Sequence, residues 1–159
     1  MNKPNRLETT YYPNGQMKEE VMRCDTRLHG TAIGWHANGA IAEKGEFRHD
    51  LREGRWQWWN AQGVCINEGY FLDGQLQGSA LERYDNGQLL AQGTWKDGEP
   101  NGLATEWYEN GRKKEECAWL DGVLHGKVTE WDRNGNIEFE AFYLNGIEMS
   151  SGLPLLEVG

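Results

Sequence analysis

The 159-residue sequence is poor in the features that mark secreted, membrane-spanning or disulfide-bonded proteins. Its cysteines number three, an odd count without a Cys-x-x-Cys spacing, which argues against a disulfide framework. The N-terminal segment contains no apolar stretch of the kind that a secretory signal needs, and no apolar run approaches the roughly 18 residues of a membrane span. These absences predict a cytoplasmic protein.

Apolar residues and positive charges are also scarce. Hydrophobic residues make up only 38% of the chain and the mean hydropathy is -0.80, yet there are 8 Trp, 6 Tyr and 4 Phe residues, which disordered acidic chains lack. A thin folded protein with aromatic packing fits this composition. The formal net charge of -9 disfavours nucleic acid and anionic membranes, because both repel an acidic surface. It favours a basic partner, or it serves solubility alone.

Glycine, in contrast, is abundant and regularly placed. An Asn-Gly or Gln-Gly pair recurs every 24 residues, and a second glycine column keeps the same period. The first column holds Gly15, Gly39, Gly63, Gly87, Gly111 and Gly135, and the second holds Gly30, Gly54, Gly78, Gly102 and Gly126. A repeat of this period over nearly the whole chain indicates an array of small structural units that stack on one another.

The stretches between the glycines alternate aromatic or aliphatic residues with polar ones, as β-strands do. Each unit is therefore expected to form one β-hairpin. About six 24-residue hairpins in single file then make an all-β linear array over residues 9–148. Residues 1–8 form an N-terminal extension, and residues 149–159 form a tail that is expected to cap the open end of the sheet.

The type of turn decides which side chains share a face of the sheet. Pro13 before Asn14 favours a three-residue loop with a type I turn and a left-handed glycine, rather than a two-residue loop. This loop places Trp107 opposite Lys113 and Thr105 opposite Glu115. One face is then expected to be apolar and to carry Ile33, Trp35, Ile41, Gly45 and Phe47.

The opposite face is expected to carry an acidic stripe. Its members are Glu82, Glu106 and Glu130 from first strands and Glu68, Glu116 and Glu140 from second strands. Trp56 and Trp58 lie outside the regular aromatic columns and are expected to be exposed anchors for a partner. The stripe and the two tryptophans form the candidate partner-binding surface, with a merely solvated polar face as the alternative.

The array scatters the residues that catalysis or metal binding would need close together. His29 and His125 share a repeat column but lie four repeats apart, roughly 40 Å at strand spacing, which is too far for a common metal ion. Glu116 and Glu140 lie closer, but an open sheet has no pocket that would shift either pKa. We therefore expect no enzyme, no cofactor and no metal site. A hydrolase or transferase built on the acidic stripe is the rival hypothesis.

The repeat resembles a known family. The stretches WLDGVLHGKVTEWDRNG at 119–135 and WKDGEPNGLATEWYENG at 95–111 resemble the MORN repeat in its bacterial 24-residue variant, and the resemblance covers about residues 9–148. Arg83 departs from the pattern, because it replaces an aromatic residue. Stand-alone chains of this kind resemble the YwqK-type antitoxin or immunity family.

This resemblance implies a small cytoplasmic protein that binds and neutralises a cognate toxin or effector protein, expected to be basic, by steric and electrostatic blockade. The alternative is a MORN-repeat scaffold or a self-associating structural protein without a toxin partner. Neither nucleic acid nor a membrane is expected as a partner, and the formation of a homo-oligomer is left open.

Overall fold

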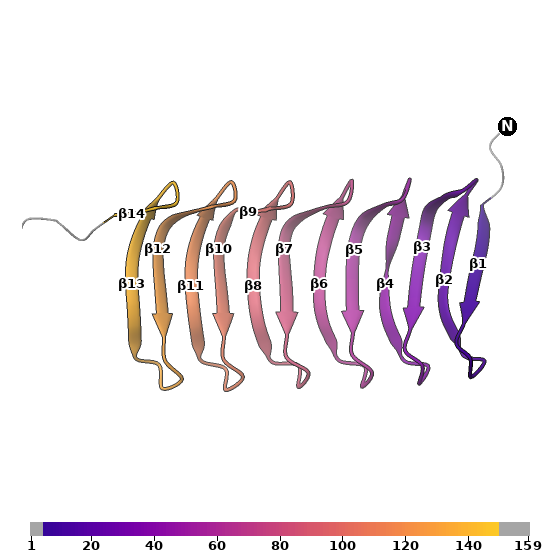
Figure 1. The fold of residues 1–159 in the computed structure, drawn as a ribbon, viewed down its shortest axis with the longest axis horizontal. Coiled ribbons are helices and arrows are strands. Elements are labelled where there is room, and N and C mark those ends of the chain that lie inside the picture. Colours follow the sequence, from indigo (N-terminus) through magenta and orange to yellow (C-terminus); the bar gives the residue numbers. More distant parts are fainter. Residues whose placement is uncertain (1–4, 150–159) are drawn as a thin grey trace, which may run out of the picture.

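A computed structural model describes residues 5–149 as one open antiparallel β-sheet (Figure 1). Its strands are β1 (Arg6–Tyr11), β2 (Met17–Cys24), β3 (Arg27–Trp35), β4 (Ile41–Arg48), β5 (Leu51–Trp59), β6 (Cys65–Leu72), β7 (Gln75–Arg83), β8 (Leu89–Lys96), β9 (Glu99–Pro100), β10 (Gly102–Trp107), β11 (Lys113–Leu120), β12 (Val123–Trp131), β13 (Ile137–Leu144) and β14 (Ile147–Met149). They lie side by side in chain order, and only β9 is off this path, paired with β8. The predicted all-β linear array is confirmed.

Six long hairpins make up the array, as the repeat predicts. They are β1–β2, β3–β4, β5–β6, β7–β8, β10–β11 and β12–β13, and β14 adds three residues at the C-terminal edge. β1 begins at Arg6, inside the stretch that the sequence sets apart as an extension. The cap that the sequence predicts for the tail lies outside the described residues.

The Asn-Gly loops have the predicted conformation. In the second hairpin, Gly39 donates its backbone N–H to the carbonyl of His36 (2.8 Å) and has a φ of 86°. His36 in turn donates its backbone N–H to the carbonyl of Ala40 (2.8 Å), which closes a three-residue loop. The equivalent glycines of the other five hairpins also have positive φ, a conformation that costs glycine little. A type I turn followed by a glycine bulge therefore joins the two strands of every hairpin.

A second bulge follows each loop, and the sequence analysis missed it. Trp107 lies opposite Lys113, as predicted. One step further, however, β11 contains an extra residue, so Thr105 pairs with Glu116 and not with the predicted Glu115. The same shift occurs in all six hairpins. Because neighbouring residues of a strand point to opposite faces, a shift of one residue exchanges the faces of the second strand relative to the first.

The predicted apolar face is wrong for this reason. Ile33 lies opposite Lys44 on one face, whereas Gly45 lies opposite Ala32 on the other. Phe47 shares the face of Gly45, two residues along the same strand. The set of residues that the sequence analysis placed together is thus divided between the two faces.

Hydrogen bonds between loops join each repeat to the next. The Tyr84 hydroxyl donates to the backbone carbonyl of Trp107 (2.7 Å), and the Tyr108 hydroxyl donates to that of Trp131 (2.8 Å). Tyr12 makes the same bond in the first repeat (2.7 Å). The polar residue after each first strand therefore ties one hairpin to its neighbour, in addition to the sheet ladder.

The centre of the core is Trp56, whose side chain is 1% exposed. It lies over Gly45, where an added Cβ would be 2.2 Å from the Trp56 ring. The Trp56 Nε1–H donates to the backbone carbonyl of Glu46 (3.0 Å), and the rings of Phe47 and Trp58 lie 4.9 and 5.7 Å away. The absence of a side chain at residue 45 is therefore what lets an indole lie flat on the sheet.

Asp132 gives the last Asn-Gly loop a pH dependence. Its carboxylate accepts the backbone N–H groups of Asn134 and Asn136 (2.8 Å each) and the Asn136 side-chain amide (2.9 Å). These bonds, that of the Asn136 side chain first, lower the pKa of Asp132 to about 2. The unfolded value is about 3.9. We expect carboxyl NMR to show titration near pH 2, and the stabilisation of this loop to be complete above about pH 4 and lost as the pH falls through 2. A midpoint near 4 would contradict this.

Candidate partner-binding face

The two faces of the sheet are named here after one residue each. The Trp56 face carries a continuous row of buried or small residues across the strands, which we call the core row: Val21, Ala32, Gly45, Trp56, Gly69, Ala80, Gly93, Ala104, Cys117, Val128 and Ala141. The Glu68 face is the opposite one. On it, a second continuous row is formed by Gln57, Glu68, Leu81, Gln92, Thr105, Glu116, Thr129 and Glu140.

The predicted acidic stripe does not exist as one surface. Glu68, Glu116 and Glu140 lie on the Glu68 face. Glu82, Glu106 and Glu130 lie on the Trp56 face, each two residues along its strand from a residue of the core row. The cause is the second bulge, which moves the second-strand glutamates to the other side of the sheet. Six glutamates that were expected to act together therefore form two separate sets.

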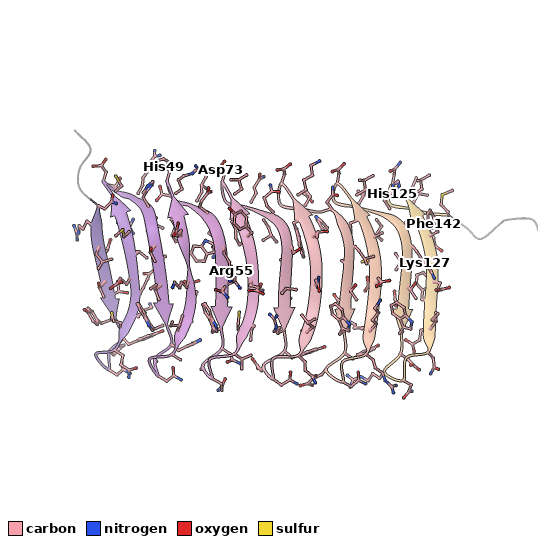
Figure 2. The ribbon with its side chains drawn as sticks, turned by 180° about the vertical axis from the view of Figure 1, so that it is seen from behind. His49, Arg55, Asp73, His125, Lys127 and Phe142 are labelled. Atoms are coloured by element: carbon pink, nitrogen blue, oxygen red, sulfur yellow. The ribbon has the colours of Figure 1, made fainter. Side chains whose placement is uncertain are left out.

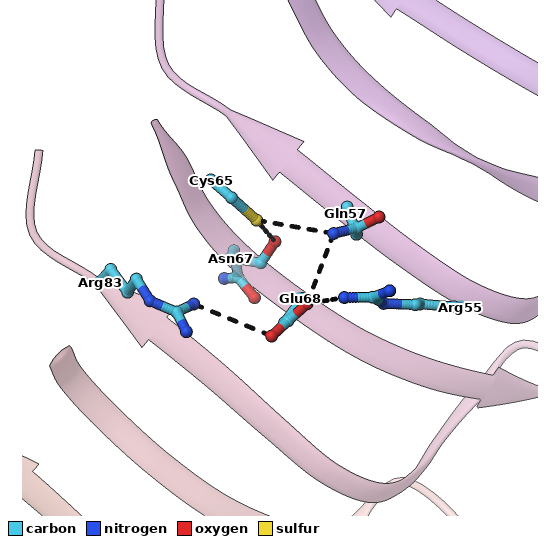
Figure 3. Close-up of polar contacts among 6 residues, drawn as sticks. All are labelled: Arg55, Gln57, Cys65, Asn67, Glu68 and Arg83. Atoms are coloured by element: carbon cyan, nitrogen blue, oxygen red, sulfur yellow. Dashed lines mark hydrogen bonds and ion pairs between the residues drawn. The ribbon is translucent and has the colours of Figure 1, made fainter. Parts of the chain in front are cut away.

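The three predicted stripe glutamates that lie on the Glu68 face are each paired with a cation. Glu68 accepts a hydrogen bond from Arg55 (2.5 Å) and lies 3.8 Å from Arg83 (Figure 3). Arg83, the residue that replaces an aromatic in the repeat, is thus an ion-pair partner. Lys113 forms an ion pair with Glu116, and Lys127 with Glu140; Arg55 and Lys127 are labelled in Figure 2. The hydrogen bond from Lys127 lowers the pKa of Glu140. This face presents paired charges to a partner.

Trp56 and Trp58 are not exposed anchors, so that prediction is wrong. Trp56 is buried and Trp58 is half-buried. The Trp58 Nε1–H donates to the Glu43 carboxylate (3.0 Å), and the Arg52 guanidinium lies over both indoles at 4.8 and 5.2 Å. Two adjacent indoles with polar partners form the core of the middle repeats, because Gly45 leaves room for them. Their first role is stability.

The Trp56 face carries a row of glutamates whose negative charges are mostly not compensated by ion pairs. In adjacent strands β10, β11 and β12, Glu106 lies directly opposite Glu115, and Glu115 lies directly opposite Glu130. Like charges in such cross-strand positions destabilise a sheet. Lys114 donates to Glu106 (2.8 Å), whereas the ion pairs among residues 5–149 include neither Glu115 nor Glu130. We call Glu82, Glu106, Glu115 and Glu130 the glutamate row.

This arrangement predicts a substitution that stabilises the fold. Glu115→Gln removes the middle charge of the three, so we expect the free energy of unfolding to rise by about 0.2–1 kcal/mol. The matched control is Glu116→Gln, one residue along the same strand but on the Glu68 face. Glu116 accepts hydrogen bonds from Lys113 and Thr105, and its neutralisation is expected to lower the stability or leave it unchanged. Urea unfolding measures both, and a loss of stability in Glu115→Gln would contradict the prediction.

An aromatic row runs parallel to the glutamate row, on the other side of the core row. It consists of Phe71, Leu76, Trp95, Pro100, Trp119 and Leu124. Leu76 lies over Gly69, and Trp95 lies over Gly93, so glycine again makes room for a large side chain. Three hollows follow one another along this face, of about 530, 220 and 220 Å³, from the Trp58 side to Trp119. The aromatic column could be recognised from the sequence, but not that it shares a face with the glutamate row.

Reactive side chains on this sheet include one buried thiol and a pair of histidine rings. Burial raises the pKa of the Cys117 thiol to about 11, so it is protonated at neutral pH. The rings of His29 in β3 and His49 in the turn after β4 approach to 5.0 Å, at the ends of the strands where Figure 2 labels His49. Within residues 5–149, no group of three or more His, Cys, Asp or Glu side chains could hold a metal ion, and no helix could cross a membrane. Glu116 lies on the opposite face from Glu106, so the two cannot form one catalytic centre.

An open sheet of repeated hairpins with one mixed apolar and acidic face defines a repeat scaffold. The MORN repeat variant family matches residues 7–25, 28–49, 76–97 and 124–145, which together are more than half of the chain. The chain belongs to this family. The MORN repeat family also matches residues 44–55 and 92–111.

Comparisons with individual proteins add little to this assignment. A comparison of the sequence with curated proteins finds no match. Among solved structures, the chain is similar to a chain of the Glycosylation Associate Protein (Gap123) complex from Streptococcus agalactiae, with 12% identity and a TM-score of 0.36. The similarity covers 67% of this chain and 20% of that chain, so the present chain spans about a fifth of its length.

Proposed function

We propose that this MORN-repeat protein is a non-enzymatic binding protein whose Trp56 face binds a basic protein partner. In keeping with its resemblance to YwqK-type antitoxins, we propose that the partner is a cognate toxin or effector and that binding neutralises it. The neutralisation requires no chemistry, because a rigid sheet that covers a cleft blocks access to it. The proposed compartment is the cytoplasm.

The observation that carries the proposal is that the glutamate row and the aromatic row lie on the same face, on either side of the core row. Glu115 and Glu130 lack ion-pair partners among the described residues and are placed where their charges repel one another. Residues that lower stability in this way are typical of binding surfaces, where function and stability compete. Aromatic side chains next to them supply contact area at low entropic cost. On the Glu68 face, by contrast, Glu68, Glu116 and Glu140 are compensated by ion pairs.

Charge also favours this class of partner. The net charge of -9 attracts a basic protein over long range and raises its association rate, an effect that salt screens. The same charge disfavours nucleic acid and anionic membranes. We therefore propose a protein partner and neither of these.

The experiment uses the product of the neighbouring open reading frame as the candidate partner. We expect its expression to stop bacterial growth, and co-expression of the present protein to restore growth and yield a complex in size-exclusion chromatography. Glu106→Gln with Glu115→Gln is expected to slow association, whereas Glu116→Gln with Glu140→Gln on the Glu68 face leaves it unchanged. Growth that is equal with and without the protein, together with no complex, would overturn the proposal.

Two rivals give different results. A self-associating MORN scaffold would show a mass above that of one chain in light scattering, and the glutamate row would not change its partner binding. A hydrolase or transferase would act on the candidate partner or its substrate catalytically, at far less than one equivalent. Neutralisation by blockade requires at least one molecule of this protein per partner, so titration of the stoichiometry separates these classes.

A further inference from the structure

The most C-terminal of the three hollows on the Trp56 face lies over β8 to β11 and is bordered by two indoles. Trp95 and Trp119 border it on the side of the aromatic row, together with Pro100, and Ala104 is part of its lining. Its volume of about 220 Å³ is below the roughly 300–1,000 Å³ of sites that enclose whole small molecules. It is therefore better suited to a single side chain than to a cofactor or a metabolite.

The repeat shows how this hollow differs from the corresponding part of the middle repeats. Ala104 occupies the position that Trp56 occupies two repeats earlier, and Glu106 occupies that of Trp58. In the middle repeats the two indoles occupy these positions and are packed by Arg52. In the fifth hairpin the same two positions carry a methyl group and a carboxylate, which leave the space empty and charge its border.

The charge at this border is negative. Glu106 and Glu115 both line the hollow, on the side opposite the indoles. Lys114 offsets one of these charges through its hydrogen bond to Glu106, and that bond raises the pKa of Lys114. Glu115 has no ion pair among the described residues, and Glu130 adds a further negative charge from β12. A group that enters the hollow thus meets apolar walls and the Glu115 carboxylate, which interacts with the Cys117 thiol but forms no ion pair among the described residues.

We propose that this hollow binds one lysine or arginine side chain of the protein partner. The aliphatic stem would lie against the indoles of Trp95 and Trp119, and the cationic head would pair with Glu115. Indole rings bind such a side chain through two interactions, which are apolar contact with its stem and attraction between the ring face and its positive charge. The inference rests on the proposed function, and it names the side chain that the partner must insert.

The test uses the full chain and short peptides of known sequence. The probes are hexalysine and hexaarginine, with hexaglutamate as the charge-reversed control, and the measurement is the shift of the tryptophan indole N–H signals by NMR. We expect the signals of Trp95 and Trp119 to shift with either cationic peptide, and that of the buried Trp56 to stay. Addition of salt is expected to weaken the shifts.

Two variants and one control decide whether the hollow is the site. Glu115→Gln is expected to weaken cationic-peptide binding about two- to fivefold, and Trp119→Leu about two- to fivefold. Glu116→Gln, on the other face of the same strand, is expected to have no effect. Far-UV circular dichroism and the loss of the native Trp56 indole N–H signal identify a Trp119→Leu variant that fails to fold, and Glu115→Gln then decides alone.

The possible outcomes distinguish a failure of the proposed site in the hollow from a failure of the proposed binding function. Equal weakening by Glu115→Gln and Glu116→Gln, or shifts spread over indoles of both faces, would overturn the site, because they indicate general charge attraction. A cognate partner that binds Glu115→Gln and Trp119→Leu as tightly as the unmodified protein would also overturn the site, but would leave the proposed binding function intact. A protein that binds the peptides at the hollow but has no protein partner would refute the proposed function alone.

Discussion

Replacing Trp56 with alanine is expected to lower the free energy of unfolding by about 3–5 kcal/mol, the range for large aromatic residues in a core. Trp56 is 1% exposed, contacts Phe47 and Trp58, and donates a hydrogen bond to the carbonyl of Glu46. Its removal would leave a cavity over Gly45 and an unpaired carbonyl. Urea unfolding followed by circular dichroism measures the loss.

The control for this substitution is Tyr70→Ala in the same hairpin. Tyr70 is 53% exposed, so its loss is expected to change stability by only about 0.5 kcal/mol. If Trp56→Ala were as mild as Tyr70→Ala, the indole could not be the centre of the core. A folded Trp56→Ala protein is expected to bind its partner nearly normally, because Trp56 offers no surface for contact.

Substituting alanine for Gly45 is the second change with a large expected effect. The φ of Gly45 is not positive, so the backbone would accept alanine, but the added Cβ would lie 2.2–2.6 Å from three atoms of the Trp56 ring. The indole is held between neighbouring rings and has no room to move. We expect a destabilisation of about 1–3 kcal/mol from this overpacking, measured by urea unfolding.

Two comparisons show whether the clash is the cause. Gly34→Ala, in the adjacent strand, meets only the flexible Glu43 side chain at 3.0 Å and is expected to be much milder. In the Trp56→Ala background, Gly45→Ala is expected to be harmless or stabilising, since its clash is gone. If the losses of unfolding free energy in the double variant were additive, the proposed contact would be contradicted, because substitutions of residues in contact have non-additive effects on stability.

The repeat and its loops could be predicted from the sequence because glycine marks them. Each loop requires a left-handed residue, and glycine recurs there every 24 residues. The second bulge carries no such mark. Its extra residue varies widely in type, for example Ala42, Ile66 and Lys114, and needs no special side chain. The order of the strands was therefore predictable, whereas the two faces of each second strand were assigned the wrong way round.

The burial of Trp56 is indicated by its repeat column. Trp56 shares its repeat column with Ala32, Ala80 and Ala104, which are small core residues. A large residue in a column of small ones needs space from a neighbour, and Gly45 provides it. The grouping of Glu106 with Glu115 could not be predicted in the same way, because it depends on the bulge. The types of residue in the candidate site could thus be predicted from the sequence, but which of them share a face could not.

The uneven packing of the array also determines where it opens. Each strand contacts mainly its neighbours, so local unfolding spreads from the ends and stops where the sheet is best packed. Ring contacts of Trp56 and its neighbours connect β4, β5 and β6 and stabilise this part of the sheet. At the other end, Phe142 and Ile147 are 54% and 69% exposed. Backbone amides of β12 to β14 are therefore expected to exchange their hydrogens sooner than those of β5. Because the glutamate row lies toward that end, a bound partner would slow this exchange, and the C-terminal hairpins would gain order from the molecule they bind.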